Sequence, residues 1–132
     1  MNGFHTDIEK DTLANNAFRK VLYTAKQLQL VLMTLQPGEE IGSEVHPEND
    51  QFFRFEGGTG ICRIDDQEYA VGDGVAVIIP SGARHNVINT GSDPLKMYTI
   101  YAPPHHKDGI IRVTKKEAEE NEEDFDSVTS EP

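Results

Sequence analysis

The amino-acid sequence predicts an all-β domain, a jelly-roll-like antiparallel barrel or sandwich. Short apolar segments of strand length are separated by turn signals rich in Gly, Pro and Asp, roughly every eight to twelve residues. No convincing long helical pattern interrupts them. The 132 residues are enough for a single domain with its own core. We therefore expect an N-terminal arm over residues 1–16, a barrel over 17–114, and an acidic tail over 115–132 that is a short helix or disordered.

Charge and composition exclude several classes of partner. The net charge of -11 argues against binding to nucleic acid or to an anionic membrane surface. Residues 115–132 hold eight acids and two lysines, and thus -6 of that charge, so the barrel itself is only mildly acidic. Cys62 is the only cysteine, which excludes an internal disulfide and a cysteine-rich zinc site. The first residues lack a signal-peptide pattern and no apolar run is long enough to span a membrane, so we expect a soluble cytoplasmic protein.

The first elements expected along the chain are two strands, preceded by a segment with two alternatives. Residues 7–14 form a short helix or lie along the domain surface. Residues 18–24 are rich in aromatic and branched side chains and predict a strand. Residues 28–35 are apolar on both faces, and Pro37-Gly38 limits them to strand length. Such a strand needs cover on both sides, from a second sheet or from another subunit. We therefore expect a homodimer.

The remaining strands are short and are separated by turns. Strands are predicted at residues 44–46, 52–55, 61–64, 68–71, 75–79, 85–89 and 95–101. Asp65-Asp66-Gln67 is the expected hairpin turn between the strands at 61–64 and 68–71. Thr114 and Glu117 match a capping box, which predicts one or two helical turns after them.

A group of possible metal ligands lies on two of these strands. Glu44 and His46 are two residues apart, so on a strand both side chains point to the same face. Gln51 begins the returning strand and adds an amide oxygen. These three donors alone make a weak site, and His85 on a later strand is the candidate fourth member.

The spacing of these residues resembles the two sequence motifs of the cupin superfamily. The second motif is matched at every fixed position by Gly74, Pro80, Ser81, Gly82, His85 and Asn89. The first motif is matched in spacing by Gly38, Glu44, His46, Gln51 and Gly58, although Glu44 replaces a histidine and Gln51 replaces a glutamate. The resemblance covers residues 38–89 and, through the strand pattern, extends to about residue 101. It implies the cupin double-stranded β-helix.

By position, the resemblance implies that Glu44, His46, Gln51 and His85 bind a divalent metal ion: zinc, manganese or iron. Two histidines, one glutamate and one glutamine are also the ligand composition of the zinc site in phosphomannose isomerases, which are cupins. The chain further resembles small cupins that are described as mannose-6-phosphate isomerase-like. The two substitutions leave open whether a metal binds at all.

Other residues are candidates for the pocket around this site. Phe53 and Phe55 share the face of Gln51 and are expected in the interior, as core or as a pocket wall. Arg84 is the candidate contact for a phosphate or carboxylate at the barrel mouth. His105 and His106, after two prolines, are candidates for a general acid or base, or are an exposed loop pair.

Three functions follow from these observations. The favoured one is a metal-dependent enzyme on a small polar organic substrate, a sugar isomerase of the mannose-6-phosphate type. The alternatives are an iron- or manganese-dependent dioxygenase, which the apolar Phe53 and Phe55 would suit, and a non-catalytic cupin that binds a small ligand. The fold alone does not decide between them.

Overall fold

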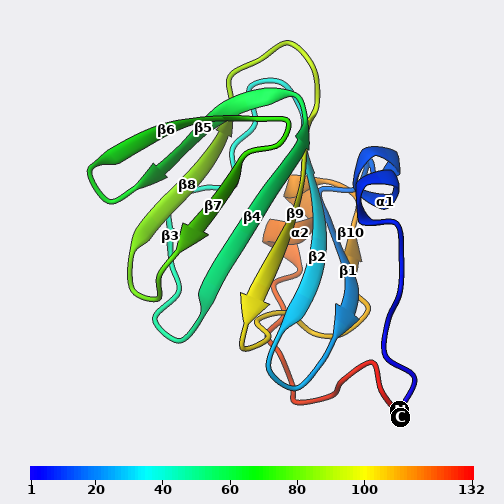
Figure 1. The fold of residues 1–132 in the computed structure, drawn as a ribbon. Coiled ribbons are helices and arrows are strands. Elements are labelled where there is room, and N and C mark those ends of the chain that lie inside the picture. The colour runs from blue at the N-terminus through cyan, green and yellow to red at the C-terminus, as the bar shows by residue number, and fades with distance from the viewer.

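The computed structural model describes residues 1–132 and has the predicted all-β antiparallel architecture. Two sheets face each other across a core (Figure 1). One sheet has six strands in the order β10-β1-β2-β9-β4-β7, and the other has four in the order β3-β8-β5-β6. The strands are β1 (Arg19–Thr24), β2 (Gln29–Leu35), β3 (Glu44–Val45), β4 (Asp50–Gly57), β5 (Thr59–Ile64), β6 (Gln67–Gly72), β7 (Ala76–Ile79), β8 (Arg84–Asn89), β9 (Leu95–Ala102) and β10 (Ile111–Arg112).

Alternating side chains of the two sheets fill the space between them. Phe53 and Phe55 of β4 are fully buried, as their shared parity with Gln51 predicts. They belong to a core cluster of 16 residues to which both sheets contribute, including Val31 of β2 and Val87 of β8. The intervening residue Arg54 points to the outer face, where its Nε lies 3.0 Å from Glu56 Oε1.

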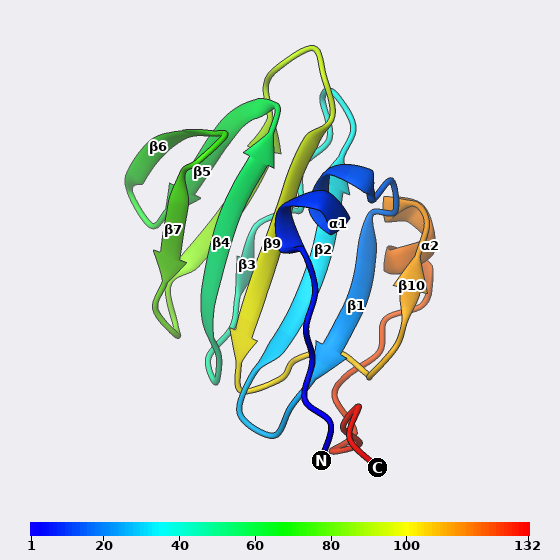
Figure 2. The same cartoon turned by 45° about the vertical axis from the view of Figure 1, so that its right-hand side comes forward.

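Strand β2 is covered on both faces by its own chain. Its inner face packs in the core, and helix α1 (Ile8–Ala14) contacts β2, β4 and β9 on the outer side (Figure 2). Asn15, after the helix, accepts a hydrogen bond from Thr34 Oγ1 at its carbonyl oxygen at 2.8 Å. The expected cover from a second sheet or subunit is therefore supplied in part by α1, whose N-cap is the side chain of Asp7.

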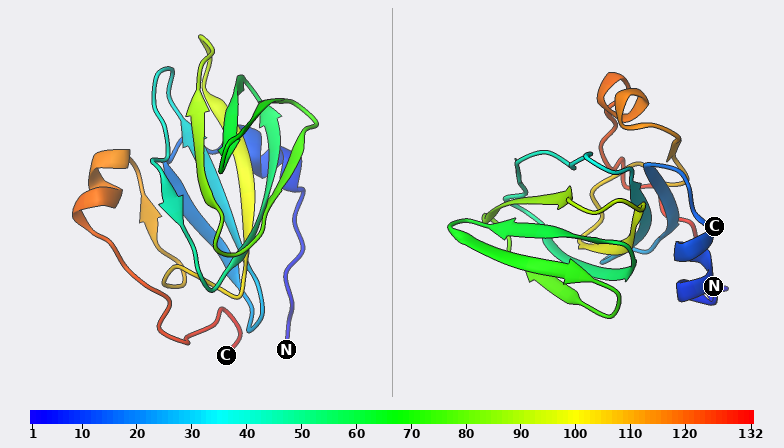
Figure 3. Two further views of the ribbon diagram at one scale, coloured as in Figure 1. Left: turned by 90° about the vertical axis from the view of Figure 1, so that its left-hand side faces the viewer. Right: turned by 90° about the horizontal axis from the view of Figure 1, so that it is seen from above.

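The C-terminal residues return to the domain. Helix α2 (Lys115–Glu120) starts at the predicted N-cap, where Thr114 Oγ1 accepts from the Glu117 amide. Glu117 Oε2 in turn accepts from the amide of Val113, the residue before the N-cap. After α2, the Ser130 amide donates to the Thr24 carbonyl at 2.9 Å. Both termini lie at the same end of the molecule (Figure 3), where the Asn2 amide donates to the Glu131 carboxylate at 3.0 Å.

Neither helix has the length and hydropathy needed to cross a membrane. The division of the chain into arm, barrel and tail remains a prediction.

Candidate metal centre

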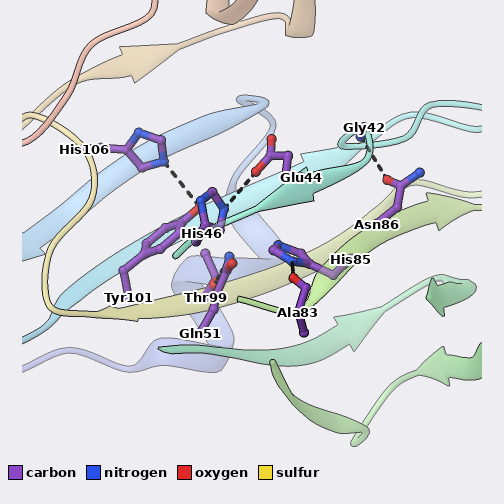
Figure 4. A network of polar contacts seen from close by, with 10 residues as sticks. All are labelled: Gly42, Glu44, His46, Gln51, Ala83, His85, Asn86, Thr99, Tyr101 and His106. Carbon is purple, nitrogen blue, oxygen red and sulfur yellow. Dashed lines mark hydrogen bonds and ion pairs between the residues drawn. The ribbon is translucent and has the colours of Figure 1, made fainter. Parts of the chain in front are cut away.

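The side chains of Glu44, His46, Gln51 and His85 gather between the two sheets (Figure 4). Glu44 on β3 is the direct cross-strand partner of His85 on β8, which places both side chains on one face of the four-stranded sheet. His46 follows β3 by one residue, and Gln51 reaches the same space from β4 in the opposite sheet. Ligand atoms of Glu44, His46 and His85 all lie within 4.8 Å of one another.

The hydrogen bond of His85 fixes its tautomer. Nδ1 lies 3.1 Å from the carbonyl oxygen of Ala83, which can only accept, so Nδ1 carries the proton. In the neutral ring Nε2 then keeps its lone pair, which is the arrangement of a metal-binding histidine. Burial lowers the pKa of His85, while the Ala83 carbonyl opposes that shift. The net effect favours the neutral, ligand-competent ring.

His46 and Glu44 form a close ion-pair contact. Nε2 of His46 lies 2.9 Å from Oε2 of Glu44. That nitrogen is buried and has no other polar partner. Burial raises the pKa of Glu44, but the contact with His46 outweighs it, so the pKa is lowered overall. Glu44 is thus the negative member of the group.

Gln51 has a second buried atom without a partner. Its Nε2 donates to Thr99 Oγ1 at 2.9 Å. Its Oε1 is buried and accepts no hydrogen bond. An unpaired buried carbonyl oxygen is costly, and a bound cation would satisfy it.

These features fit a divalent cation. One carboxylate, one imidazole fixed by a backbone carbonyl, one imidazole whose buried nitrogen contacts that carboxylate, and one unpaired amide oxygen are suitable donors for a first-row metal. A cation would also neutralise Glu44. The cluster of Glu44, His46 and His85 is compatible with a divalent metal, and the assignment of Gln51 as the fourth ligand stays a prediction.

A second layer of rings lies beside the cluster. The ring of His105 is 4.4 Å from that of His46, centroid to centroid, and is stacked on Tyr101 at 5.2 Å. Gln29, fully buried on β2, accepts from the backbone amides of His105 and His106 at 3.2 and 2.9 Å. Burial lowers the pKa of His105, and His46 lowers it further. His105 is therefore held beside the cluster as a neutral base.

His106 lies deeper than His105. Burial lowers its pKa to about 2, so its ring is neutral, and its Nε2 lies 3.3 Å from the Tyr101 hydroxyl. Burial also raises the pKa of Tyr101. The histidine pair is therefore packed at the site, and the alternative of an exposed loop pair is wrong.

A cavity of about 350 Å³ opens beside these residues. It is lined by Glu44, His46, His105 and His106, by Phe18 and Arg19 at the start of β1, and by residues of α2 and the segment after it. Most lining residues are polar. Phe53 and Phe55 are core residues and do not line the cavity.

Arg84 does not line the cavity either. It precedes the inward-facing His85 on β8, so its side chain points to the opposite face, where Nη1 donates to Ser43 Oγ at 3.3 Å. The expectation of Arg84 as a substrate contact is therefore not supported by its position, and Arg19 is the arginine of the cavity.

Three functional candidates were missed by the sequence reasoning: Arg19, Gln29 and Thr99. Gln29 and Thr99 are polar residues at inward positions of otherwise apolar strands. Such a position is itself a signal, because a buried polar group needs a partner. Their partners come from distant parts of the chain, which the strand pattern of one sequence does not identify.

Comparisons with known proteins agree with this architecture. A family model described as "Cupin domain" matches residues 31–101. The uncharacterized protein YrkC of Bacillus subtilis is 46% identical over 121 residues, covering 87% of this chain, and this chain spans 65% of the length of YrkC. The uncharacterized protein L612 of Acanthamoeba polyphaga mimivirus is 40% identical, with 85% of this chain and 72% of the relative covered. The crystal structure of BH2720 from Bacillus halodurans superposes with a TM-score of 0.89 at 44% identity, covering 91% of this chain and 96% of that one.

Proposed function

Because the chain belongs to the cupin domain family, we propose that it is a divalent-metal-dependent enzyme that moves a proton on a small polar substrate, as sugar isomerases do. One observation carries this proposal. The base His105 lies with its ring 4.4 Å from that of His46, so a proton acceptor stands directly beside the donor cluster and lines the same cavity.

The roles of the residues follow from this placement. A bound divalent cation would polarise a carbonyl and a neighbouring hydroxyl, which acidifies the carbon-bound proton between them. Glu44, His46, Gln51 and His85 would hold that cation. His105 accepts the carbon-bound proton and returns it to the adjacent carbon, while the hydroxyl proton passes to the former carbonyl oxygen. Gln29 keeps His105 in place through the backbone amides of residues 105 and 106.

The donor set supports an isomerase of the mannose-6-phosphate type, since two histidines, one glutamate and one glutamine also form the zinc site of phosphomannose isomerases. The polar cavity lining supports a hydroxylated substrate. A dioxygenase drew its support from Phe53 and Phe55 as a cavity wall, and both residues are buried in the core instead. We therefore do not retain it as a second candidate.

Proton exchange tests this proposal across a whole class of substrates at once. The metal-loaded protein is incubated in D₂O with a panel of aldoses, ketoses and their phosphates, and deuterium at the carbon next to the carbonyl is followed by NMR. We expect incorporation that chelation of the metal abolishes. His105→Gln should reduce its rate by about 10²- to 10⁴-fold.

His5→Gln serves as the matched control, because His5 is an exposed histidine of the N-terminal arm. It should leave the exchange rate unchanged. A protein that holds metal stoichiometrically but exchanges no proton across the panel would instead be a non-catalytic ligand-binding cupin.

A further inference from the structure

Arg19 is a charged residue at an inward-facing position of the six-stranded sheet. It begins β1 and is the cross-strand partner of Met33, a core residue of β2. Val21, two residues further along the same strand, also faces the core. The partner of Arg19 on the other side is Arg112 of β10, so the Arg19 guanidinium stands between a core methionine and a second arginine. A guanidinium is costly to bury unless it is paired.

The guanidinium of Arg19 has no polar partner in the chain. Its Nε is buried and makes no hydrogen bond. No carboxylate lies within ion-pair distance of it. It contacts the ring of Phe18, whose centroid is 5.4 Å from the guanidinium carbon. Arg19 lines the same cavity as His46 and His105, so its free donors lie beside the donor cluster.

The other charges of the cavity have partners or face solvent. Glu123 pairs with Arg112, and Glu119 lies 3.8 Å from Lys115. Glu44 belongs to the donor cluster. Glu122 and Asp124 are exposed and lie toward solvent. Arg19 is therefore the cavity-lining cation that lacks a counter-ion, and the acids of the outer cavity remain available to accept hydrogen bonds from hydroxyl groups.

We propose that Arg19 binds an anionic group of the substrate, a carboxylate or a phosphate, while the rest of the substrate reaches the donor cluster. The planar guanidinium fork matches both groups through paired hydrogen bonds. The substrate is then a small hydroxylated carbonyl compound with one anionic end. This inference rests on the proposed function for the role of the cluster, but the anion preference is measurable by itself.

The test compares neutral and anionic probes of one size class. Binding of fructose, fructose 6-phosphate and galacturonate to the metal-loaded protein is measured by calorimetry at low ionic strength, and repeated with chelator. We expect an anionic probe to bind at least about tenfold more tightly than fructose, and Arg19→Gln to remove that difference. The anionic probe that loses affinity in Arg19→Gln shows whether Arg19 binds a phosphate or a carboxylate.

Two further variants control for charge and folding. Arg84→Gln removes an arginine that lies outside the cavity and should keep the preference. Arg19→Lys keeps the positive charge but not the planar guanidinium, and should retain part of the preference for anionic probes. Arg19→Gln should melt close to the wild-type temperature, since the guanidinium makes no hydrogen bond in the structure.

The outcomes separate this inference from the proposed function. If Arg19→Gln removes the preference in a protein that holds no metal, the anion site stands and the enzyme proposal fails. If metal binds and protons exchange but wild type and Arg19→Gln show the same relative affinities, the anion site is refuted and the enzyme proposal stands.

Discussion

Gln51 and Thr99 are joined by a hydrogen bond of 2.9 Å from the amide nitrogen of Gln51 to the hydroxyl of Thr99. The two residues lie on neighbouring strands, β4 and β9, of the six-stranded sheet. In this arrangement the amide oxygen of Gln51 is buried without a partner. Thr99 thereby holds the Gln51 side chain beside the two histidines.

Thr99→Val should therefore weaken metal binding. Valine keeps the shape of threonine but removes the acceptor that orients Gln51, and loss of such an outer partner typically costs about 10- to 100-fold in metal affinity. The dissociation constant for zinc or manganese, measured by competition with a chelator, should rise by that factor.

Thr34→Val is the matched control for that change. Thr34 is also a buried threonine of the six-stranded sheet, but it bonds to Asn15 beneath α1. It should lower stability without changing metal affinity. Equal metal affinities for Thr99→Val and wild type would show that Gln51 needs no orientation or is no ligand.

The features that the sequence predicts correctly depend on the local spacing of residues and on turn residues. The positions of Gly74, Pro80 and His85 predict the second motif, and alternation along β4 predicts that Phe53 and Phe55 are inside. Helix α2 follows from the capping box at Thr114. These features are local, so one sequence is enough to find them.

Features that depend on distant pairing were not predicted. Strand β10 has two residues and exists because Arg19 and Lys20 pair with Arg112 and Ile111. Arg19 was missed because its inward position depends on the register with Met33. Arg84 was expected at the barrel mouth as the neighbour of His85, but in β8 the inward His85 turns the Arg84 side chain to the opposite face.

The outer face of the six-stranded sheet carries apolar side chains that α1 leaves uncovered. Phe52 pairs across strands with Ile78 and Ile100, and Ile78 is 67% exposed. The ring of Phe52 is also 6.2 Å from that of Tyr98. We propose that a second copy of the chain covers this face in a homodimer.

Ile78→Glu should shift the protein from dimer to monomer at micromolar concentration, because a charge at the centre of the contact would be desolvated. Sedimentation velocity measures this directly. Tyr69→Glu, at an exposed apolar residue of β6 in the other sheet, is the control. A wild-type protein that sediments as a monomer would refute the dimer.

Cys62 provides a pH-dependent measurement of folding. The thiol is fully buried, and burial raises its pKa from 9.0 to about 11. The unfolded chain therefore loses this proton at lower pH than the folded one, so stability should fall as pH rises from about 9 toward 11. Urea denaturation across this range should show the fall, and Cys62→Ala should reduce it. If the stability of Cys62→Ala and of the wild type falls equally with pH, the pKa of the Cys62 thiol is not raised in the folded protein.

The metal content of the protein shows whether Glu44, His46 and His85 form a metal centre. Elemental analysis of the purified protein should find about one divalent ion per chain, with zinc favouring the isomerase. His46→Ala combined with His85→Ala should lose that metal, while His5→Ala should keep it. Substoichiometric metal in the wild type, unchanged in the double variant, would show that these residues do not form a metal centre.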